Sequence, residues 1–380
     1  MARNAVAALL EHGQSAWQDD ISREMLKTGF LQRQVNDVGI RGVTTNPTIF
    51  QKAISGGDAY DDQIVELMGE GKTAEELFEA VEVTDVRDAC DVLHPVYDRS
   101  DGADGFVSIE VSPDAARNPD ATRDQVRRLW AAVDRPNSMV KIPGTVEAEP
   151  VIEEMLREGK NINITLLFSI QHYEKVALAY VSALEQRLAA GERVDNVASV
   201  ASFFVSRVDT LVDKLLEAAI AQSTGDGKRA LLDALQGKVA IANAKLAYVK
   251  FREIFDGDRF APLRAAGAKV QRPLWASTGT KNPAYSDVLY VETLIGPNTV
   301  NTMTRATIEA FADHGAVRPT LEEDVDEARQ VMQDLADSGI DIDQVTSQLE
   351  DEGIASFASS FDELLEGVEA KRSALATAAD

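Results

Sequence analysis

The chain has 380 residues, of which 44% are hydrophobic and 27% charged, and its formal net charge is −25. This composition is typical of a globular protein that is soluble in water. Binding to nucleic acid or to an anionic membrane requires a basic face, so the acidic composition argues against both classes of partner. A single cysteine, Cys90, excludes an intrachain disulfide framework and a thiolate metal site. The sequence contains neither a signal-peptide pattern nor a long apolar run, which predicts a cytoplasmic protein.

Short apolar runs typical of strands alternate along the chain with longer stretches that have the spacing of amphipathic helices. The predicted strands are residues 16–19, 42–46, 106–111, 139–142, 162–168, 197–204, 273–277 and 288–292. Alternation of strand and helix is the pattern of a parallel sheet covered by helices. Eight strands are the number in a (β/α)8 or TIM barrel, an α/β fold that typically needs about 250 residues.

The residues beyond that length are helical in pattern and fall in two places. Residues from about 208 to 262 contain no obvious strand and enlarge the connection before the seventh predicted strand. Residues from about 318 to 380 form a second helical segment, which we expect to pack on the barrel. Neither an internal repeat nor a Pro/Gly/Ser-rich linker divides the chain. We therefore predict one TIM-barrel domain over residues 1–380, with a helical insertion and a C-terminal helical extension.

Lys141 is the first candidate for chemistry, because it interrupts the apolar run 139–142 directly before Pro143 and Gly144. A lysine is rarely buried unless its charge is paired or used. Burial favours the neutral amine, which is the form that attacks a carbonyl carbon. On this segment alone, an edge-strand lysine that reaches solvent is an equally good interpretation.

Polar residues also end most of the other predicted strands, where TIM barrels place their reactive groups. Taken singly, each is explained by a helix cap or a loop hydrogen bond. A ring of acids, amides, hydroxyls and a lysine around one barrel mouth is instead typical of a catalytic site. In chain order these residues are Asp19, Asn46, Glu110, Lys141, Asn163, Thr165, Ser202, Arg207, Ser277 and Lys281.

These residue types suit imine chemistry on a sugar phosphate. A neutral lysine forms a Schiff base with a ketone, and the protonated imine accepts electrons as the adjacent carbon–carbon bond breaks. Asp19 and Glu110 can carry the protons if burial raises their pKa, and Thr165 suits the orientation of a relay water. The other groups suit the substrate: Asn46, Asn163 and Ser202 a polyol chain, and Arg207, Ser277 and Lys281 a phosphate.

Neither a metal site nor a cofactor is expected. The four histidines, His12, His94, His172 and His314, share no ligand spacing. Residues 278–281, Thr-Gly-Thr-Lys, lack the upstream glycine of a Walker A loop, so they indicate an anion site more than a nucleotide site.

Three segments resemble the signatures of the transaldolase family: residues 42–50, residues 140–145 around Lys141, and residues 161–169. Residues 17–23, 107–113, 276–283 and 360–365 are similar to its longer bacterial branch. Together these segments extend the resemblance over most of the chain.

The resemblance implies a role for each candidate. Lys141 would be the Schiff-base nucleophile and Asp19, favoured over Asp20 by the family's Trp-x-Asp spacing, the principal acid/base. Phe204 stands where related sugar-phosphate aldolases tend to carry tyrosine, which favours transfer over free aldol cleavage. Lys281 would replace an arginine that the short-chain branch places after the seventh-strand serine. Glu110 and Thr165 would hold the catalytic water. The sugar hydroxyls would be bound by Asn46, Asn163 and Ser202, and the phosphate by Arg207.

The implied activity is that of a transaldolase of the pentose phosphate pathway, working without a cofactor. It would move a dihydroxyacetone unit reversibly from sedoheptulose 7-phosphate to glyceraldehyde 3-phosphate, giving erythrose 4-phosphate and fructose 6-phosphate. Two alternatives remain open: a class I aldolase that releases free dihydroxyacetone, and a non-catalytic sugar-phosphate-binding protein. The expected partners are sugar phosphates, with no nucleic acid and no membrane, and the chain is expected to be a monomer or a homodimer.

Overall fold

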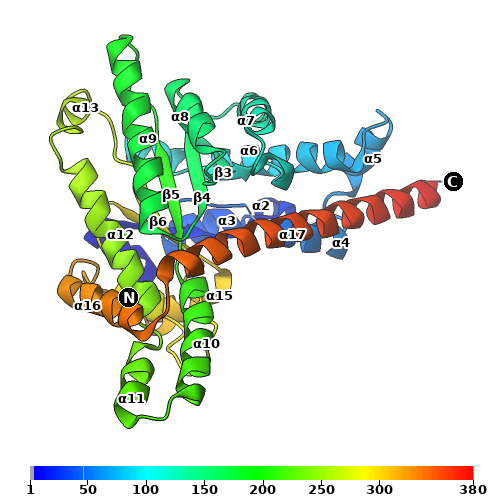
Figure 1. Ribbon diagram of the computed structural model, residues 1–380. Helices are drawn as coiled ribbons and strands as arrows, with labels where there is room; N and C mark the ends of the chain where they lie inside the picture. Colours follow the sequence, from blue (N-terminus) through cyan, green and yellow to red (C-terminus); the bar gives the residue numbers. More distant parts are fainter. Residues whose placement is uncertain (1–3, 46, 380) are drawn as a thin grey trace.

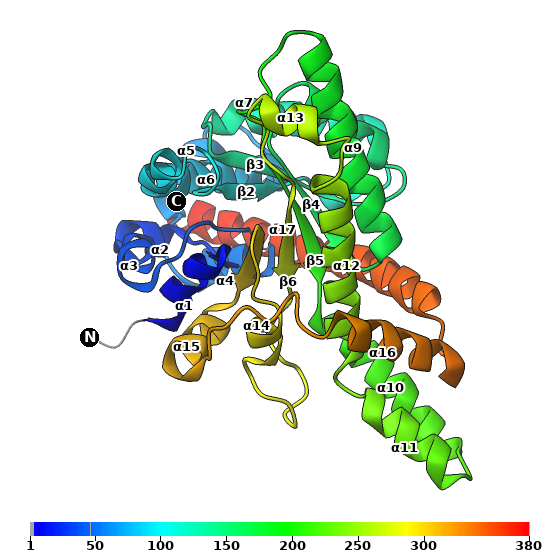
Figure 2. The ribbon, with the colours of Figure 1, turned by 90° about the vertical axis from the view of Figure 1, so that its left-hand side faces the viewer.

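The computed structural model describes residues 4–45 and 47–379. At its centre is a curled sheet of seven parallel strands in the order β1-β7-β6-β5-β4-β3-β2, with helices around the outside (Figures 1 and 2). The strands are β1 Gln14–Gln18, β2 Val107–Glu110, β3 Ser138–Pro143, β4 Ile162–Leu167, β5 Ser199–Phe204, β6 Arg272–Ala276 and β7 Thr299–Met303.

The helices occupy most of the rest of the chain. Before β4 they are α1 Ala5–Ala8, η1 Leu9–His12, α2 Arg23–Lys27, α3 Phe30–Arg33, η2 Gln34–Val38, α4 Pro47–Gly56, α5 Asp61–Met68, α6 Ala74–Arg99, η3 Pro113–Ala115, α7 Pro119–Val133 and α8 Glu149–Arg157. After β4 they are α9 Ile170–Ala189, α10 Ser206–Gln222, α11 Asp226–Leu235, α12 Val239–Phe255, α13 Ala261–Ala265, α14 Leu289–Thr293, α15 Arg305–His314, α16 Val325–Ser338 and α17 Ile342–Ala379. None of the helices in the described ranges is long and apolar enough to cross a bilayer.

The strand predicted at residues 42–46 is reduced to a single bridging residue between the two ends of the sheet. Val43 bridges Gln18 of β1 and Val107 of β2. The backbone N–H of Val43 donates to the Phe106 carbonyl at 2.9 Å, and its own carbonyl accepts from the Ser108 N–H at 2.9 Å. The extended segment is short because α4 begins at Pro47, a residue that cannot donate to a strand ladder. With the curled parallel sheet, this makes the fold TIM-barrel-like.

The strand predicted at residues 288–292 is wrong. Residues Leu289–Thr293 form α14, and the strand that pairs with β1 and β6 is β7, ten residues further on. A short apolar run does not distinguish a strand from a buried helical turn. The sequence of β7, Thr-Val-Asn-Thr-Met, is mostly polar and neither alternates strictly nor forms an apolar run, so it carries no strand signal, yet all five residues are buried.

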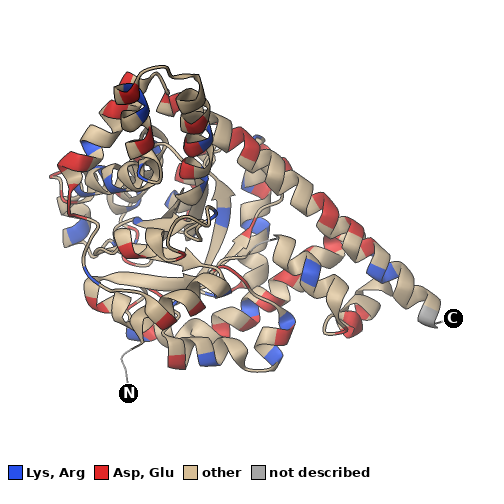
Figure 3. Ribbon diagram, turned by 90° about the horizontal axis from the view of Figure 1, so that it is seen from below, with Lys and Arg blue, Asp and Glu red and all other residues tan. Residues whose placement is uncertain are grey.

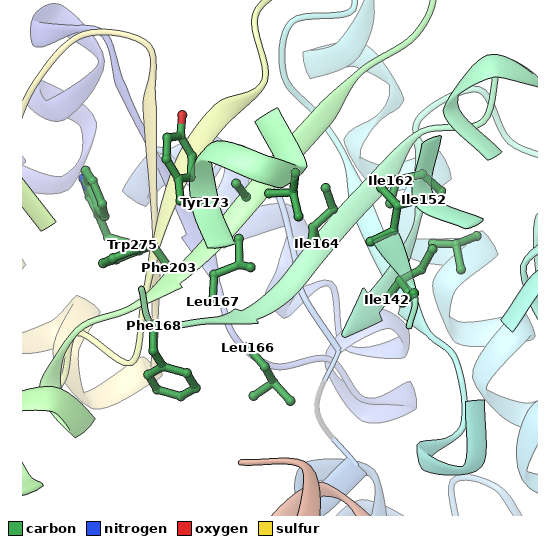
Figure 4. Close-up of a cluster of buried hydrophobic side chains, with 14 of the residues drawn as sticks. Ile142, Ile152, Ile162, Ile164, Leu166, Leu167, Phe168, Tyr173, Phe203 and Trp275 are labelled. Carbon is green, nitrogen blue, oxygen red and sulfur yellow. The ribbon is translucent and has the colours of Figure 1, made fainter. Parts of the chain in front are cut away.

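The strands are buried on both faces, as expected for a parallel sheet covered by helices. All six residues of β4 are buried. Figure 4 shows Ile162 gathered with Ile142 of β3 and Ile152 of α8 on the side that faces the outer helices. Each such buried aliphatic side chain stabilises the fold by about 1.5–3 kcal/mol, so the β3–β4 region, which carries Lys141 and Thr165, is rigidly held.

An ionic network joins the strands at the end where they begin. Asp104, which is 3% exposed, accepts hydrogen bonds from Trp17 Nε1 at 3.0 Å, from Arg41 Nε at 2.8 Å and from the Ser15 hydroxyl. Arg272 of β6 donates to the same Ser15 hydroxyl at 2.7 Å. The network therefore links β1, the bridging segment and β6.

The two helical stretches of the sequence lie outside the sheet. Helices α10 to α13 connect β5 to β6, and α10 and α11 project together from the body of the molecule (Figures 1 and 2). The long helix α17 runs across the molecule and packs on α4, α5, α6 and α10 (Figure 1). Asp and Glu residues are spread over the outer helices, including α17 (Figure 3), in agreement with the acidic composition.

Candidate active site

A cavity of about 530 Å³ opens at the end of the sheet where the strands terminate. The predicted site residues meet there, with two exceptions: Asn163 does not line the cavity, and Asn46 lies outside the described residues. The predicted residues that line it are Asp19, Glu110, Lys141, Thr165, Ser202, Phe204, Arg207, Ser277 and Lys281.

Lys141 points into this cavity from β3 and is paired with Glu110 of β2. The two residues are neighbours in the parallel register of β2 and β3. Lys141 Nζ donates to Glu110 Oε2 at 3.0 Å, and it lies 3.5 Å from the Thr45 carbonyl oxygen. The side chain of Lys141 is only 13% exposed and that of Glu110 8%. Because β3 lies between β2 and β4, the interpretation of Lys141 as an edge-strand lysine in solvent is excluded.

Burial raises the pKa of both carboxyl groups that face the lysine. For Glu110, the desolvation outweighs the opposing effect of Lys141. For Asp19, burial raises the pKa, while Lys141 and a hydrogen bond from Thr44 lower it. Thr44 Oγ1 donates to Asp19 Oδ1 at 2.8 Å, which fixes the orientation of that carboxyl group. A raised pKa makes a carboxyl group a better proton carrier, because it can both take up and release a proton during the reaction.

Asp20, the neighbour of Asp19, is held elsewhere. Its Oδ2 accepts a hydrogen bond from Arg305 Nη2 at 3.1 Å. Asp20 is not among the residues that line the cavity, whereas Asp19 is. The structure thus separates two adjacent acids that composition alone does not distinguish.

The end of β4 is distorted beside Thr165. Leu166 has a φ of 60°, and the register between β4 and β5 shifts between Ile164 and Leu167. A left-handed conformation of this kind costs about 1–3 kcal/mol for a residue other than glycine. Thr165 is 1% exposed, lines the cavity, and its hydroxyl has no hydrogen-bond partner among the described residues. An orphaned hydroxyl at this place is suited to holding a water or a substrate oxygen.

Asn163 supports the wall of the cavity from behind. It is completely buried. Its Oδ1 accepts a hydrogen bond from the Ser202 hydroxyl at 2.7 Å, and its Nδ2 donates to the Ser108 hydroxyl at 3.0 Å. Both the oxygen and the nitrogen of the Asn163 amide are therefore hydrogen-bonded. Asn163 is connected to the cavity through Ser202, which lines it.

Arg207 supplies the positive charge of the cavity away from the lysine. Its guanidinium carbon lies 5.2 Å from the centre of the Phe204 ring. Burial lowers its pKa, and Asp19 and then Glu352 oppose that shift. Within residues 4–45 and 47–379, no carboxylate lies at ion-pair distance from it. A half-buried guanidinium without an ion-pair partner among the described residues is suited to an anionic ligand.

Ser277 and Lys281 border the same side of the cavity on the loop after β6. Ser277 has a φ of 54°, and its hydroxyl lies 2.9 Å from that of Ser206 at the start of α10. Lys281 is exposed, so it reaches the cavity from the solvent side.

Several residues of the site have no clear signal in the sequence. Thr302 and Thr304 line the cavity at the end of the unrecognised strand β7, and four residues of α17 line it from a place distant in the sequence. Glu82 of α6 is 5% exposed, and burial followed by repulsion from Glu110 raises its pKa well above the usual value. Between Val81 and Val83, Glu82 looks in the sequence like an ordinary surface charge.

The histidines are not gathered into a site. In the part of the chain that the structure describes, no group of three or more His, Cys, Asp and Glu side chains is placed to hold a metal ion. His172 of α9 instead lies 3.1 Å from Glu350 of α17.

A TIM-barrel-like sheet with a largely buried amine and two largely buried carboxyl groups at its strand ends defines the class of protein, an aldolase-like α/β enzyme. The chain belongs to the transaldolase/fructose-6-phosphate aldolase family, whose model matches residues 16–368. This confirms the resemblance recognised in the sequence motifs.

Similar proteins of known name extend over almost the whole chain. A transaldolase of Trichodesmium erythraeum is 46% identical over 98% of both chains. A transaldolase of Mycobacterium tuberculosis is 47% identical over 95% of both, and transaldolase 2 of a Nostoc species is 45% identical over 98% of both. At this similarity and coverage the matches are not confined to one motif.

Proposed function

We propose that the chain is a transaldolase, a transferase that moves a dihydroxyacetone unit between sugar phosphates. The donor is sedoheptulose 7-phosphate and the acceptor glyceraldehyde 3-phosphate, and the products are erythrose 4-phosphate and fructose 6-phosphate. The observation that carries the proposal is the buried Lys141 amine, 3.0 Å from a carboxyl group whose pKa burial raises, in a cavity that also holds a free guanidinium. The names of the relatives support the same activity.

Imine formation begins at Lys141. Glu110 takes a proton from the ammonium group, and the neutral amine attacks the ketone carbon of the donor. The carbinolamine then loses its hydroxyl as water, with the proton supplied by Glu110 and the water held by Thr165. This gives a protonated imine between Nζ and the former carbonyl carbon.

Carbon–carbon cleavage follows at Asp19. Its carboxylate removes the proton from the hydroxyl group next to the bond that breaks, an aldehyde leaves, and the electron pair passes to the imine. The acceptor aldehyde then adds to the resulting enamine, and Asp19 returns the proton to the new hydroxyl oxygen. Water finally hydrolyses the imine and restores Lys141.

The substrate is held along the rest of the cavity. We assign the sugar hydroxyls to Ser202 and Asn46, with Asn163 acting through the 2.7 Å hydrogen bond to Ser202. We assign the phosphate to Arg207, together with Ser277 and Lys281 on the adjacent loop after β6. Phe204 supports the Arg207 guanidinium by a cation–π contact.

We also propose that the chain forms one (β/α)8 domain in which residues 42–44 take the place of the second strand. Helices α10 to α13 are then the insertion, and α16 and α17 the extension. The double bridge at Val43 and the contacts of α17 with four other helices support this assignment. A cytoplasmic location and a monomeric or homodimeric state stay predictions from the sequence.

Acceptor dependence tests transfer against release of free dihydroxyacetone. We expect fructose 6-phosphate to be consumed rapidly only when erythrose 4-phosphate is present. Equal consumption without the acceptor would identify an aldolase. Borohydride reduction in the presence of fructose 6-phosphate should add a dihydroxyacetone mass to the peptide that contains Lys141, and an unmodified peptide would leave a binding protein as the remaining reading.

A further inference from the structure

Helix α17 contributes one face to the wall of the catalytic cavity. Gly353, Ser356, Phe357 and Ser360 all line it. Their spacing of three, four and seven residues places them on one side of a helix. Two contacts hold the helix in this position. Before the stripe, His172 Nδ1 lies 3.1 Å from Glu350 Oε2, and at its last member Thr48 Oγ1 donates to Ser360 Oγ at 3.2 Å.

Gly353 of α17 lies close to the end of β4 and to Arg207. A Cβ atom placed there would lie 3.1 Å from Leu166 Cδ2 and 3.7 Å from Arg207 Nη1. Figure 4 shows the Leu166 side chain on the opposite side of β4 from Leu167. Glycine in a helix interior costs about 1 kcal/mol relative to alanine. The close approach to Leu166 favours glycine here, whereas the distance to Arg207 is an ordinary van der Waals contact.

The cavity beside this wall contains polar groups that are left without protein partners. The Thr165 hydroxyl is buried and unpartnered within the described residues, and the Arg207 guanidinium is held by an aromatic ring in place of a carboxylate. Both groups point to a polar ligand between the strand ends and α17.

We propose that α17 is part of the substrate site, and that Gly353 is a specificity-determining residue for substrates with a terminal phosphate. The helix closes the side of the Arg207 subsite, and the missing side chain at residue 353 lets α17 pack tightly against Leu166, in van der Waals range of the Arg207 guanidinium. The inference rests on the proposed transaldolase function. It assigns to the C-terminal helix a role in recognition, beyond its packing on α4, α5 and α6.

The test compares Gly353→Ala with Gly367→Ala on the same helix. A Cβ atom at Gly367 would meet Ser55 Oγ at 3.0 Å, and Gly367 does not line the cavity. Both changes favour the helical state, so thermal unfolding should show folded proteins. For Gly353→Ala we expect KM for fructose 6-phosphate to rise roughly tenfold, with kcat within about twofold of the parent. Inhibition by inorganic phosphate should weaken in parallel, and Gly367→Ala should match the parent in both measurements.

Dihydroxyacetone, which has no phosphate, provides the second measurement. The concentration that gives half-maximal borohydride trapping on Lys141 should be unchanged in Gly353→Ala, because the lysine end of the cavity is untouched. Ser356→Leu adds bulk to the same wall at an exposed position and should also raise KM for fructose 6-phosphate.

Two outcomes would overturn the inference while leaving the proposed function intact. One is a Gly353→Ala variant that has the parent KM and the parent inhibition by phosphate. The other is an equal loss of dihydroxyacetone trapping and of fructose 6-phosphate turnover, which would indicate general damage to the site. Absence of transfer in the parent protein would instead contradict the proposed function itself.

Discussion

At the scale of single residues, the chemistry of the site depends on which carboxyl groups surround one amine. Lys141 meets Glu110 directly and Asp19 across the cavity, and burial raises the pKa of both acids. Glu82 adds a third buried carboxyl group behind Glu110. This arrangement keeps protons available beside an amine that must lose and regain them.

Replacing Lys141 by methionine tests the nucleophile. The side chains are similar in length, and Glu110 can take up a proton when its cation is removed, so we expect a folded protein. Turnover of fructose 6-phosphate should fall by at least about 10⁴-fold, because the covalent route is lost. Circular dichroism and thermal unfolding serve as controls, and retention of more than a few per cent of the parent kcat would contradict the assignment.

Glu82→Gln tests the electrostatic cost of the buried acid. The folded-state pKa of Glu82 is raised above its unfolded value. Below the unfolded pKa, Glu82 is protonated in both states and does not destabilise the folded protein. This stability is lost as pH rises through the folded pKa, because the buried carboxyl group must then ionise. Because glutamine has no such penalty, Tm of the variant should exceed that of the parent at pH 8, and the difference should shrink toward pH 5. Glu66→Gln, on the exposed face of α5, is the matched control, and a Tm difference for Glu82→Gln independent of pH would refute this explanation.

At the scale of elements, two devices shape the barrel mouth. The ends of β4 and β6 carry left-handed residues, Leu166 and Ser277, that redirect the chain where it lines the cavity. The segment of residues 42–44 replaces a full strand and still provides hydrogen bonds to both neighbours. The short segment leaves room for Thr44 and Thr45 to face Asp19 and Lys141.

Gly42→Ala tests the bridging segment. A Cβ atom at this position would lie 2.4 Å from Trp17 Cε2, inside the packed core. Since Trp17 is completely buried, neither partner can move without cost, and we expect a loss of about 3 kcal/mol in the free energy of unfolding by urea. Gly57→Ala, where nothing lies within 4 Å of the added atom, should change stability little. Equal stabilities of the two variants would show that the segment is not held against Trp17.

At the scale of the whole molecule, opposite ends of the sheet have different tasks. The end where the strands begin is joined by Asp104 and its partners from β1, residue 41 and β6. The end where they terminate contains the cavity, with its unpaired and strained groups. The ionic network around Asp104 therefore lies at the opposite end of the sheet from the catalytic cavity.

Asp104→Asn tests this division. The change leaves the Arg41 and Arg272 guanidinium groups without their shared carboxylate, and burial already lowers the pKa of Arg272. We expect a loss of about 3 kcal/mol in stability, with kcat and KM of the folded enzyme unchanged. Asp351→Asn, which removes an exposed bridge to Arg117, should have no measurable effect. A large change in KM for Asp104→Asn would contradict the separation of the two ends.

Much of this protein is determined by local sequence. Alternating apolar runs and helical stretches predicted the parallel α/β architecture, because the period of the apolar residues follows the geometry of each element. The motifs around Lys141, Glu110 and Thr165 predicted most of the cavity, since strand ends carry its polar groups. The eighth strand was misplaced because a short apolar run and a polar buried strand have no distinct local period.

Only the tertiary structure decided the rest. It paired Asp20 with Arg305, in agreement with the choice of Asp19 that the motif spacing favoured, and it placed Asn163 behind Ser202. It also buried Glu82 beside Glu110 and brought Gly353 of α17 to Arg207, across a large part of the chain. These relations depend on distances between segments that are remote in sequence, and burial and proximity in space set both the pKa values and the shape of the cavity.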